Sequence, residues 1–227
     1  SAPTPNPTPP SSSCVALPSE TGGPFPGDGT NTSRGPTSNV LTVPGINRSD
    51  MRSSLVGFGS KTAAGVNLTL KMTLASVSSN CATPLANHVI YLWHCDRDGG
   101  YSLYDSPVAT ESYLRAIQIT DSAGAATFRT IFPGCYVGRM PHMHFEIFTS
   151  LAQAISGNND VKTSQLAFPN DVSKTIYNTA EYAVSKTNFT NLSFASDGVF
   201  SDGFSSQLCT VTGDLANGYA AEIKLSI

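Results

Sequence analysis

The sequence predicts an all-β protein, a β-sandwich with long loops and one or two short helices. Short segments with apolar residues at alternate positions recur along the chain, and turns that contain Gly or Pro separate them. Charged residues make up only 13% of the 227 residues, while Ser, Thr, Asn and Gly are abundant, and this composition disfavours long helices. A chain of this length with 40% hydrophobic residues can bury one substantial core.

The chain is expected to divide into a tether, residues 1–13, and a single folded domain, residues 14–227. The tether is rich in Pro, Ser and Thr and has too few apolar side chains to form a core, which is typical of an exported protein after signal removal. Residues 14–38 contain several Gly and Pro and should form a long loop. Residues 41–56 are ambiguous, with a turn at 47–52 that should lead into a strand.

The strand pattern becomes clear in the middle of the chain. From Val66 to Leu74 apolar residues alternate with mostly polar ones, as in a half-buried strand. The next strand, residues 86–95, contains a continuous apolar run, so both of its faces should be buried. Residues 113–119 form a third strand, and the turn Asp121-Ser122-Ala123-Gly124 should join it in a hairpin to residues 126–131.

The second half should contain shorter elements. Residues 151–159 and 171–179 are predicted to form short helices, on either side of a strand at 163–168. Residues 218–227 alternate apolar and polar side chains and predict a closing strand. The chain shows no internal repeat.

Charge and cysteine content exclude several classes of protein. The formal charge is −3 and the 13 Lys and Arg form no basic run, so the sequence carries no electrostatic footprint for nucleic acid. No apolar stretch is long enough to span a membrane. The cysteines form no CxxC pair and favour disulfides, with at least one left unpaired in the chain, which predicts a secreted or extracytoplasmic protein. They are Cys14, Cys81, Cys95, Cys135 and Cys209.

The main candidate for chemistry lies in residues 130–147. In an extended segment successive side chains point to opposite faces, so His142, His144 and Glu146 should share one face while the apolar residues between them face the core. Two neutral imidazoles on one face can bind the same metal ion. The chain has only 4 His, so two on one face form an unusual concentration.

Two tyrosines and an arginine accompany this pair. Tyr101 and Tyr136 lie near glycines in loops at the ends of predicted strands, where a rigid scaffold can position functional side chains, and Arg139 precedes the two histidines. Three interpretations stay open from the residues alone. The histidines could be hydrogen-bonded in a polar groove, the tyrosines could complete a metal site, or Glu146 could complete a His-His-carboxylate site.

Three segments resemble the core of the intradiol ring-cleavage dioxygenases, particularly their secreted members. They are WHCDRDGGYS (93–102), YLRAIQITDSAG (113–124) and FRTIFPGCYVGRMPHMHF (128–145). The segment CVALPSETGGPF (14–25), which follows the tether, is similar to the start of those secreted members. The resemblance is strong over residues 81–148, and it implies a non-haem Fe(III) enzyme that cleaves catechols with O₂ to cis,cis-muconates in aromatic-compound catabolism.

By this resemblance Tyr101, Tyr136, His142 and His144 would hold the ferric ion. Phenolate oxygens suit a hard, highly charged ion, and the ion would stabilise the tyrosinates, since a free phenol titrates near about 10. Tyr136 would be the tyrosinate that leaves the iron and accepts a proton from the substrate. Glu146 then has no assigned contact with the metal.

The resemblance assigns two further residues, each with a structural alternative. Arg139 would stabilise negative charge that develops on the substrate ring, or else form a structural ion pair. Gln165 is similar to a family glutamine near the iron, or else lies at a strand edge.

The sequence departs from the family pattern at several points. Ala116 stands where the secreted members usually have Gly, Tyr136 and His142 are closer in sequence than in the intracellular catechol enzymes, and Cys135 adjoins a ligand. A disulfide between Cys95 and Cys135 would tie the two ligand-bearing loops together. A different class of function also stays open, an inactive β-sandwich that binds carbohydrate or a surface. The oligomeric state is left undetermined.

Overall fold

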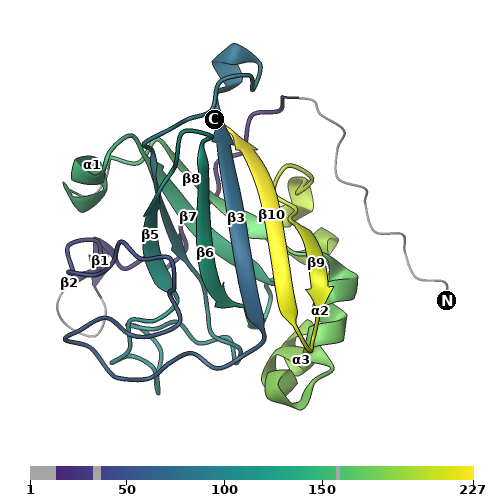
Figure 1. The fold of residues 1–227 in the computed structure, drawn as a ribbon. Coiled ribbons are helices and arrows are strands. Elements are labelled where there is room, and N and C mark those ends of the chain that lie inside the picture. Colours follow the sequence, from purple (N-terminus) through teal and green to yellow (C-terminus); the bar gives the residue numbers. More distant parts are fainter. Residues whose placement is uncertain (1–13, 33–36, 157–158) are drawn as a thin grey trace.

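The structure, a computed structural model, describes residues 14–32, 37–156 and 159–227 (Figure 1). Two four-stranded β-sheets pack face to face, and a two-stranded sheet lies beside them. The predicted all-β sandwich is therefore confirmed. The predicted tether, residues 1–13, lies outside the described residues.

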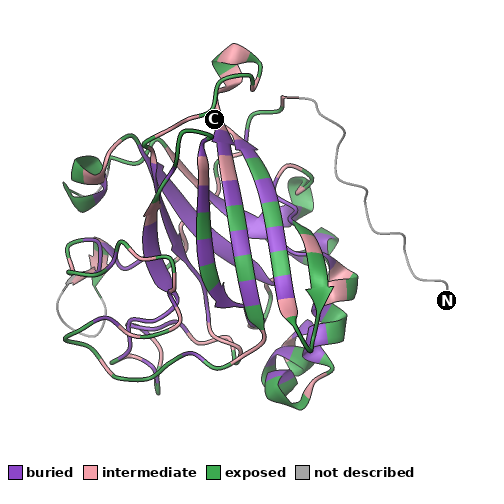
Figure 2. Cartoon of the chain, in the orientation of Figure 1, coloured by how far each residue is buried: buried purple, intermediate pink, exposed green. Residues whose placement is uncertain are grey.

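One sheet, called here the open sheet, has the strand order β6-β3-β10-β9. Along β3 and β10 side chains alternate between buried and exposed (Figure 2), because one face packs on the core and the other lies in water. This alternation confirms the strands predicted from Val66 and in residues 218–227. The strands are β3 (Asn67–Ala75), β6 (Ala125–Ile131), β9 (Thr210–Asp214) and β10 (Gly218–Ser226).

The other sheet, called the covered sheet, has the antiparallel order β5-β4-β7-β8. Every residue of its two central strands is buried, which confirms that both faces of the strand in 86–95 are covered. The inner face shares the main core with the open sheet, and the outer face packs on a second apolar cluster that includes Val40, Leu41 and Leu55. The strands are β4 (Val89–Trp93), β5 (Arg115–Ile119), β7 (His142–Phe148) and β8 (Lys162–Ala167).

The turn at 121–124 forms, but the hairpin predicted around it is wrong. Asp121 O accepts a hydrogen bond from Gly124 N at 2.9 Å. However, β5 pairs with β4 in the covered sheet and β6 pairs with β3 in the open sheet. A turn sequence specifies chain reversal and leaves the choice of partner strand to packing, and here the chain crosses from one sheet to the other.

The N-terminal part also differs from the prediction. The loop expected at 14–38 contains the short strands β1 (Asp28–Thr32) and β2 (Thr37–Asn39), which pair with each other. No strand follows the turn at 47–52. Instead Asn47 and Asp50 make isolated bridges to β5 and β6, in different sheets, so this segment spans the sheets without joining either.

Three α-helices occur in the described part of the chain, whereas one or two were predicted. The first two confirm the predictions, and the third was not predicted because its sequence, AVSKTNF, has no helical apolar periodicity. None of the helices among the described residues is long and apolar enough to cross a membrane. The helices are α1 (Leu151–Ser156), α2 (Asn170–Tyr177) and α3 (Ala183–Phe189), and the 3₁₀ turns are η1 (Val77–Ser79), η2 (Ala180–Tyr182), η3 (Phe194–Ser196) and η4 (Phe200–Asp202).

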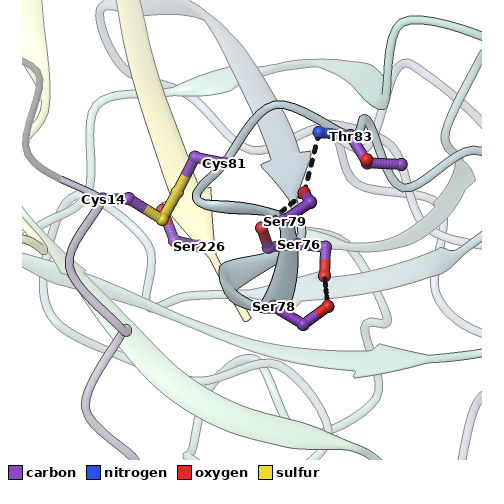
Figure 3. The surroundings of a disulfide bond; sticks show 7 residues. All are labelled: Cys14, Ser76, Ser78, Ser79, Cys81, Thr83 and Ser226. Carbon is purple, nitrogen blue, oxygen red and sulfur yellow. Dashed lines mark hydrogen bonds between the residues drawn. A yellow bond between two sulfur atoms is a disulfide. The ribbon is translucent and has the colours of Figure 1, made fainter.

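The cysteines pair differently from the hypothesis. Cys14 and Cys81 form a disulfide, which ties the start of the described chain to the region beside Ser226 at the end of β10 (Figure 3). Cys95 and Cys135 are buried free thiols, so the proposed bond between them is wrong. The thiol of Cys135 instead donates to Arg139 O at 3.3 Å, within its own loop.

Candidate metal centre

Strand β7 places two histidines on the outer face of the covered sheet. His142 and His144 are both buried, at 1% and 2% exposure. Trp93 of β4 pairs with His144 across the sheet, and their rings stack at 5.2 Å between centroids with an interplanar angle of 7°. The indole and the sheet therefore hold the imidazole of His144 in one orientation.

Two tyrosines from separate loops reach the same point. Tyr136 Oη lies 3.1 Å from His142 Nε2, and Tyr101 Oη lies 3.5 Å from it. His144 Nε2 also lies 3.1 Å from His142 Nε2. All four side chains that the resemblance proposed as ligands thus converge, although they come from three segments of the chain.

These donor atoms fit a metal ion. Nitrogen and oxygen ligands lie about 2.0–2.2 Å from a transition metal, which puts adjacent ligands about 3 Å apart, as observed here. His142 Nδ1 lies 2.6 Å from Met140 O, and a carbonyl only accepts, so Nδ1 carries the hydrogen. His142 Nε2 therefore presents its lone pair to the cluster, as metal-binding histidines do.

The protonation of these side chains follows from burial. Burial lowers the pKa of His142 to about 3 and the pKa of His144 well below its ordinary value, so both imidazoles are neutral at pH 7. Burial also raises the pKa of Tyr101 and of Tyr136, while the charge of Arg139 opposes the rise of the Tyr136 pKa. A bound cation would supply the positive charge that two tyrosinates require.

Glu146 lies on the same strand face but outside this cluster. It lines a pocket that also contains Asp28 and Asp160, and burial together with these two carboxylates raises the pKa of Glu146 to about 9. No group of three His, Cys, Asp or Glu side chains within the described residues is placed to hold a metal ion. The His-His-carboxylate interpretation therefore finds no support in the geometry.

Arg139 and Gln165 lie together at the edge of the centre. Arg139 Nη2 donates to Gln165 Oε1 at 2.6 Å, and Gln165 Nε2 donates to Thr21 O at 2.8 Å. Gln165 is also the cross-strand partner of His144. The structure thus brings both predicted residues to the site, and it shows that Gln165 connects the arginine to the N-terminal segment.

The N-terminal segment 14–27, called here the strap, lies over the outer face of the centre. Gly23 has φ +70°, and a Cβ at this position would lie 3.1 Å from His144 Cε1. The ring of Phe25 lies 4.9 Å from the ring of Tyr101. A larger residue at position 23 would displace the imidazole, so the close approach of the strap requires glycine.

Sequence reasoning missed two residues that organise the site. Arg115 is 1% exposed and donates to Pro26 O at 2.6 Å, to Phe25 O at 2.9 Å and to Ser102 O at 3.0 Å, which fastens the strap to the Tyr101 loop. A charged residue inside a predicted strand was the available signal for Arg115. The other residue, Asp197, binds Arg139 and carried no signal, because residues 190–206 have no periodic pattern.

Comparison with known proteins defines the class. The sequence model of the family described as Dioxygenase matches residues 46–206, well over half of the chain. The chain belongs to this dioxygenase family, and the predicted membership of the intradiol ring-cleavage dioxygenases is confirmed. The protein is accordingly classed as a ring-cleavage enzyme. None of the curated proteins matches the sequence.

Several solved structures share the fold. An intradiol ring-cleavage dioxygenase from Tetranychus urticae has a TM-score of 0.65 at 24% identity, over 80% of this chain and 86% of that one. The dioxygenase domain of a dioxygenase and carbohydrate-binding protein fusion from Streptomyces sp. SirexAA-E has a TM-score of 0.55 at 20% identity, over 94% and 98%. A 3-chlorocatechol 1,2-dioxygenase from Rhodococcus opacus 1CP has a TM-score of 0.53 at 19% identity, over 81% and 67%. At these identities the similarity shows a common fold.

Proposed function

We propose that the protein is a non-haem Fe(III) intradiol dioxygenase that cleaves catechols with O₂ to cis,cis-muconates. Family membership supports cleavage of catechol-type rings in general. The iron assignment rests on one observation, the convergence of two imidazoles and two phenols within 3.1–3.5 Å. The ion would be held by Tyr101, Tyr136, His142 and His144.

The reaction breaks the ring bond between the two hydroxyl-bearing carbons. Each of these carbons gains one atom of O₂ and becomes a carboxyl carbon, so the reaction needs no external reductant. When bound, ferric iron would supply Lewis acidity that favours the ionised forms of the tyrosines and of the catechol. The donor set suits this ion, because phenolate oxygens are hard ligands.

The two tyrosines have different surroundings, which supports different roles. Tyr101 is 1% exposed, packs against Phe25, and its backbone N–H binds Asp105 Oδ2 at 2.8 Å. Tyr136 is only half-buried. This difference supports assigning to Tyr136 the role of the phenol that turns away when substrate binds and accepts a substrate proton.

Arg139 is the positive group beside this acceptor. The guanidinium hydrogen-bonds to Tyr136 and helps to lower its pKa against the effect of burial. It is held by Gln165 Oε1 and by the carboxylate of Asp197. A fixed cation at this position would stabilise negative charge that develops on the substrate ring without reorganising during the reaction.

A secreted or extracytoplasmic location belongs to the same proposal. The disulfide between Cys14 and Cys81 supports it, since structural disulfides persist in oxidising compartments. The partners implied are a catecholic small molecule and O₂.

The test uses the purified protein loaded with ferric iron. We expect one iron per chain, a burgundy colour from charge transfer between tyrosinate and iron, and O₂ uptake with catechol that yields a muconate spectrum. Tyr136→Phe should lose most of the colour and activity. A protein that stays colourless with added iron, or a product of extradiol cleavage, would contradict the proposal, and the former result would favour the inactive binding protein.

A further inference from the structure

We infer that Asp197 is the positioning residue of this centre, which fixes Arg139 beside Tyr136 and, through Met140, orients His142. This inference rests on the proposed function, because it assigns a task to Asp197 within that site. Asp197 lies in the connection between η3 and η4, a region with no predicted element, and its side chain is completely buried.

The carboxylate of Asp197 binds two parts of the molecule at once. Within its own turn, Oδ1 accepts from the backbone N–H groups of Val199 at 2.8 Å and Phe200 at 3.1 Å. Across the site, Oδ2 accepts from the backbone N–H of Met140 at 2.6 Å. Arg139 Nε donates to both oxygens, at 3.2 and 3.1 Å. A fully buried carboxylate with this many donors is a rigid anchor.

One residue separates this anchor from a proposed metal ligand. The N–H of Met140 binds Asp197, and the O of Met140 accepts from His142 Nδ1 at 2.6 Å. Asp197 therefore holds the residue whose carbonyl selects the tautomer and orientation of His142. Partners of this kind, which lie behind a metal ligand, tune the ligand without touching the metal.

The same carboxylate fixes the guanidinium of Arg139. Asp197 holds Nε, Gln165 holds Nη2, and the ring of Phe200 lies 5.8 Å from Cζ. These contacts hold the guanidinium beside Tyr136, with which it forms a side-chain hydrogen bond. Asp197 thus acts on two functional side chains while contacting neither the proposed ion nor its ligands directly.

A purely structural role, as a cap for the turn at 197–200, is the alternative. The substitution Asp197→Asn separates the two roles. An amide oxygen in the place of Oδ1 can still accept from Val199, Phe200 and Arg139 Nε, whereas an amide NH₂ in the place of Oδ2 cannot accept from Met140 N–H. The substitution therefore preserves the cap, removes the bond to Met140, and leaves Arg139 Nε one neutral acceptor in place of two charged ones. Asp202→Asn is the matched control, since it removes the same charge from an exposed residue of η4.

The experiment compares wild type, D197N and D202N as iron-loaded proteins. We expect D197N to bind iron, to shift the charge-transfer band, and to lose about 10- to 100-fold in kcat with catechol while KM changes much less. D202N should match wild type in all three. In the metal-free proteins, histidine ¹⁵N NMR should show that the Nδ1–H of His142 is protected from exchange in wild type and loses protection in D197N.

The outcomes separate the two proposals. A wild type that neither binds iron nor cleaves catechol overturns the proposed function, while the metal-free NMR comparison still tests the role of Asp197. A D197N protein that keeps the wild-type band, kcat and His142 protection overturns the inference. The double variant R139Q/D197N gives a second test. The inference is also overturned if the kcat losses of R139Q and D197N multiply in the double variant and its His142 Nδ1–H is as protected from exchange as in R139Q. If D197N fails to fold, D197S serves instead, because Ser also caps turns but is too short to reach Met140.

Discussion

The open and covered sheets each have four strands and share one core, yet only the covered sheet carries the candidate centre. In the open sheet the outer side chains of β3 and β10 lie in water, as with Lys71 and Glu222. In the covered sheet the strap and residues 40–55 lie over the outer face. Even the polar residues His142, His144 and Glu146 are therefore only 1%, 2% and 6% exposed.

This difference explains why the chemistry is confined to one sheet. A metal site needs neutral imidazoles and a water-poor surrounding in which charge interactions are strong. Burial lowers the pKa of His142 to about 3, which the exposed face of the open sheet could not do. A polar residue on a strand that is buried on both faces therefore marks function, while the same residue on the open sheet is ordinary surface.

The largest expected effect comes from comparing a phenol of the candidate centre, which lies on the covered sheet, with a phenol of the open sheet. Tyr101→Phe should lower iron content and reduce kcat/KM for catechol by more than about 100-fold, since even indirect partners of a metal ligand are worth 10- to 100-fold. Tyr219→Phe makes the same change in β10 of the open sheet and should leave both unchanged. Iron analysis and O₂ uptake provide the measurement. Equal behaviour of the two variants would break the comparison.

The next effect concerns one arginine in each sheet. Arg115 is buried in β5 and makes five side-chain hydrogen bonds, whereas Arg129 is exposed on β6. Arg115→Met should lower the free energy of unfolding by about 3 kcal/mol, because it leaves buried carbonyls without donors. Arg129→Met should change it by less than about 0.5 kcal/mol. Urea denaturation of the metal-free proteins measures both free energies of unfolding. Similar losses in the two variants would show that fastening the strap through Arg115 contributes little to stability.

The third effect appears only on acidification and concerns the boundary between the sheets. His94, at the end of β4, accepts from Thr130 Oγ1 of β6 at 2.7 Å and donates from Nδ1 to Cys95 O at 2.7 Å. Burial lowers the pKa of His94 from 6.5 to about 4. Between these values the unfolded chain takes up a proton that the folded protein does not, so acidification destabilises the fold.

The measurement for His94 is the free energy of unfolding of the metal-free protein between pH 7 and pH 4. Relative to His94→Gln, the wild type should lose about 1.4 kcal/mol per pH unit as pH falls through this window, and the difference should be constant above about pH 6.5. Comparing the two proteins cancels the contributions of the other histidines. Parallel pH curves would show that His94 takes up its proton equally in the folded and the unfolded protein.

The alternation of side chains was the most informative sequence feature. It predicted the exposed and buried faces of β3 and β10, and it placed His142 and His144 on one face with Met143 and Phe145 on the other. Side-chain direction along a strand follows from backbone geometry alone, so a single segment suffices to predict it. The proposed ligand set also includes Tyr101 and Tyr136, which lie in loops, and the family resemblance was needed to propose them.

Features that join distant segments could not be predicted in this way. The partners of β5 and β6, the pairing of Cys14 with Cys81 and the place of Asp197 each depend on residues far apart in sequence. Strand β9 was missed because its sequence, TVTGD, is short and interrupted by Gly. The strap was expected as a loop, but nothing in its own residues indicates what it covers.

The sequence by itself determined the all-β class and the faces to which the histidines and core residues point, because these depend on local backbone geometry and composition. Only the tertiary structure decided that Tyr101 and Tyr136 meet the histidines within 3.5 Å, that the strap encloses them, and that Asp197 stands behind Arg139. Distances between loops depend on how whole sheets pack, and packing is a property of the complete chain.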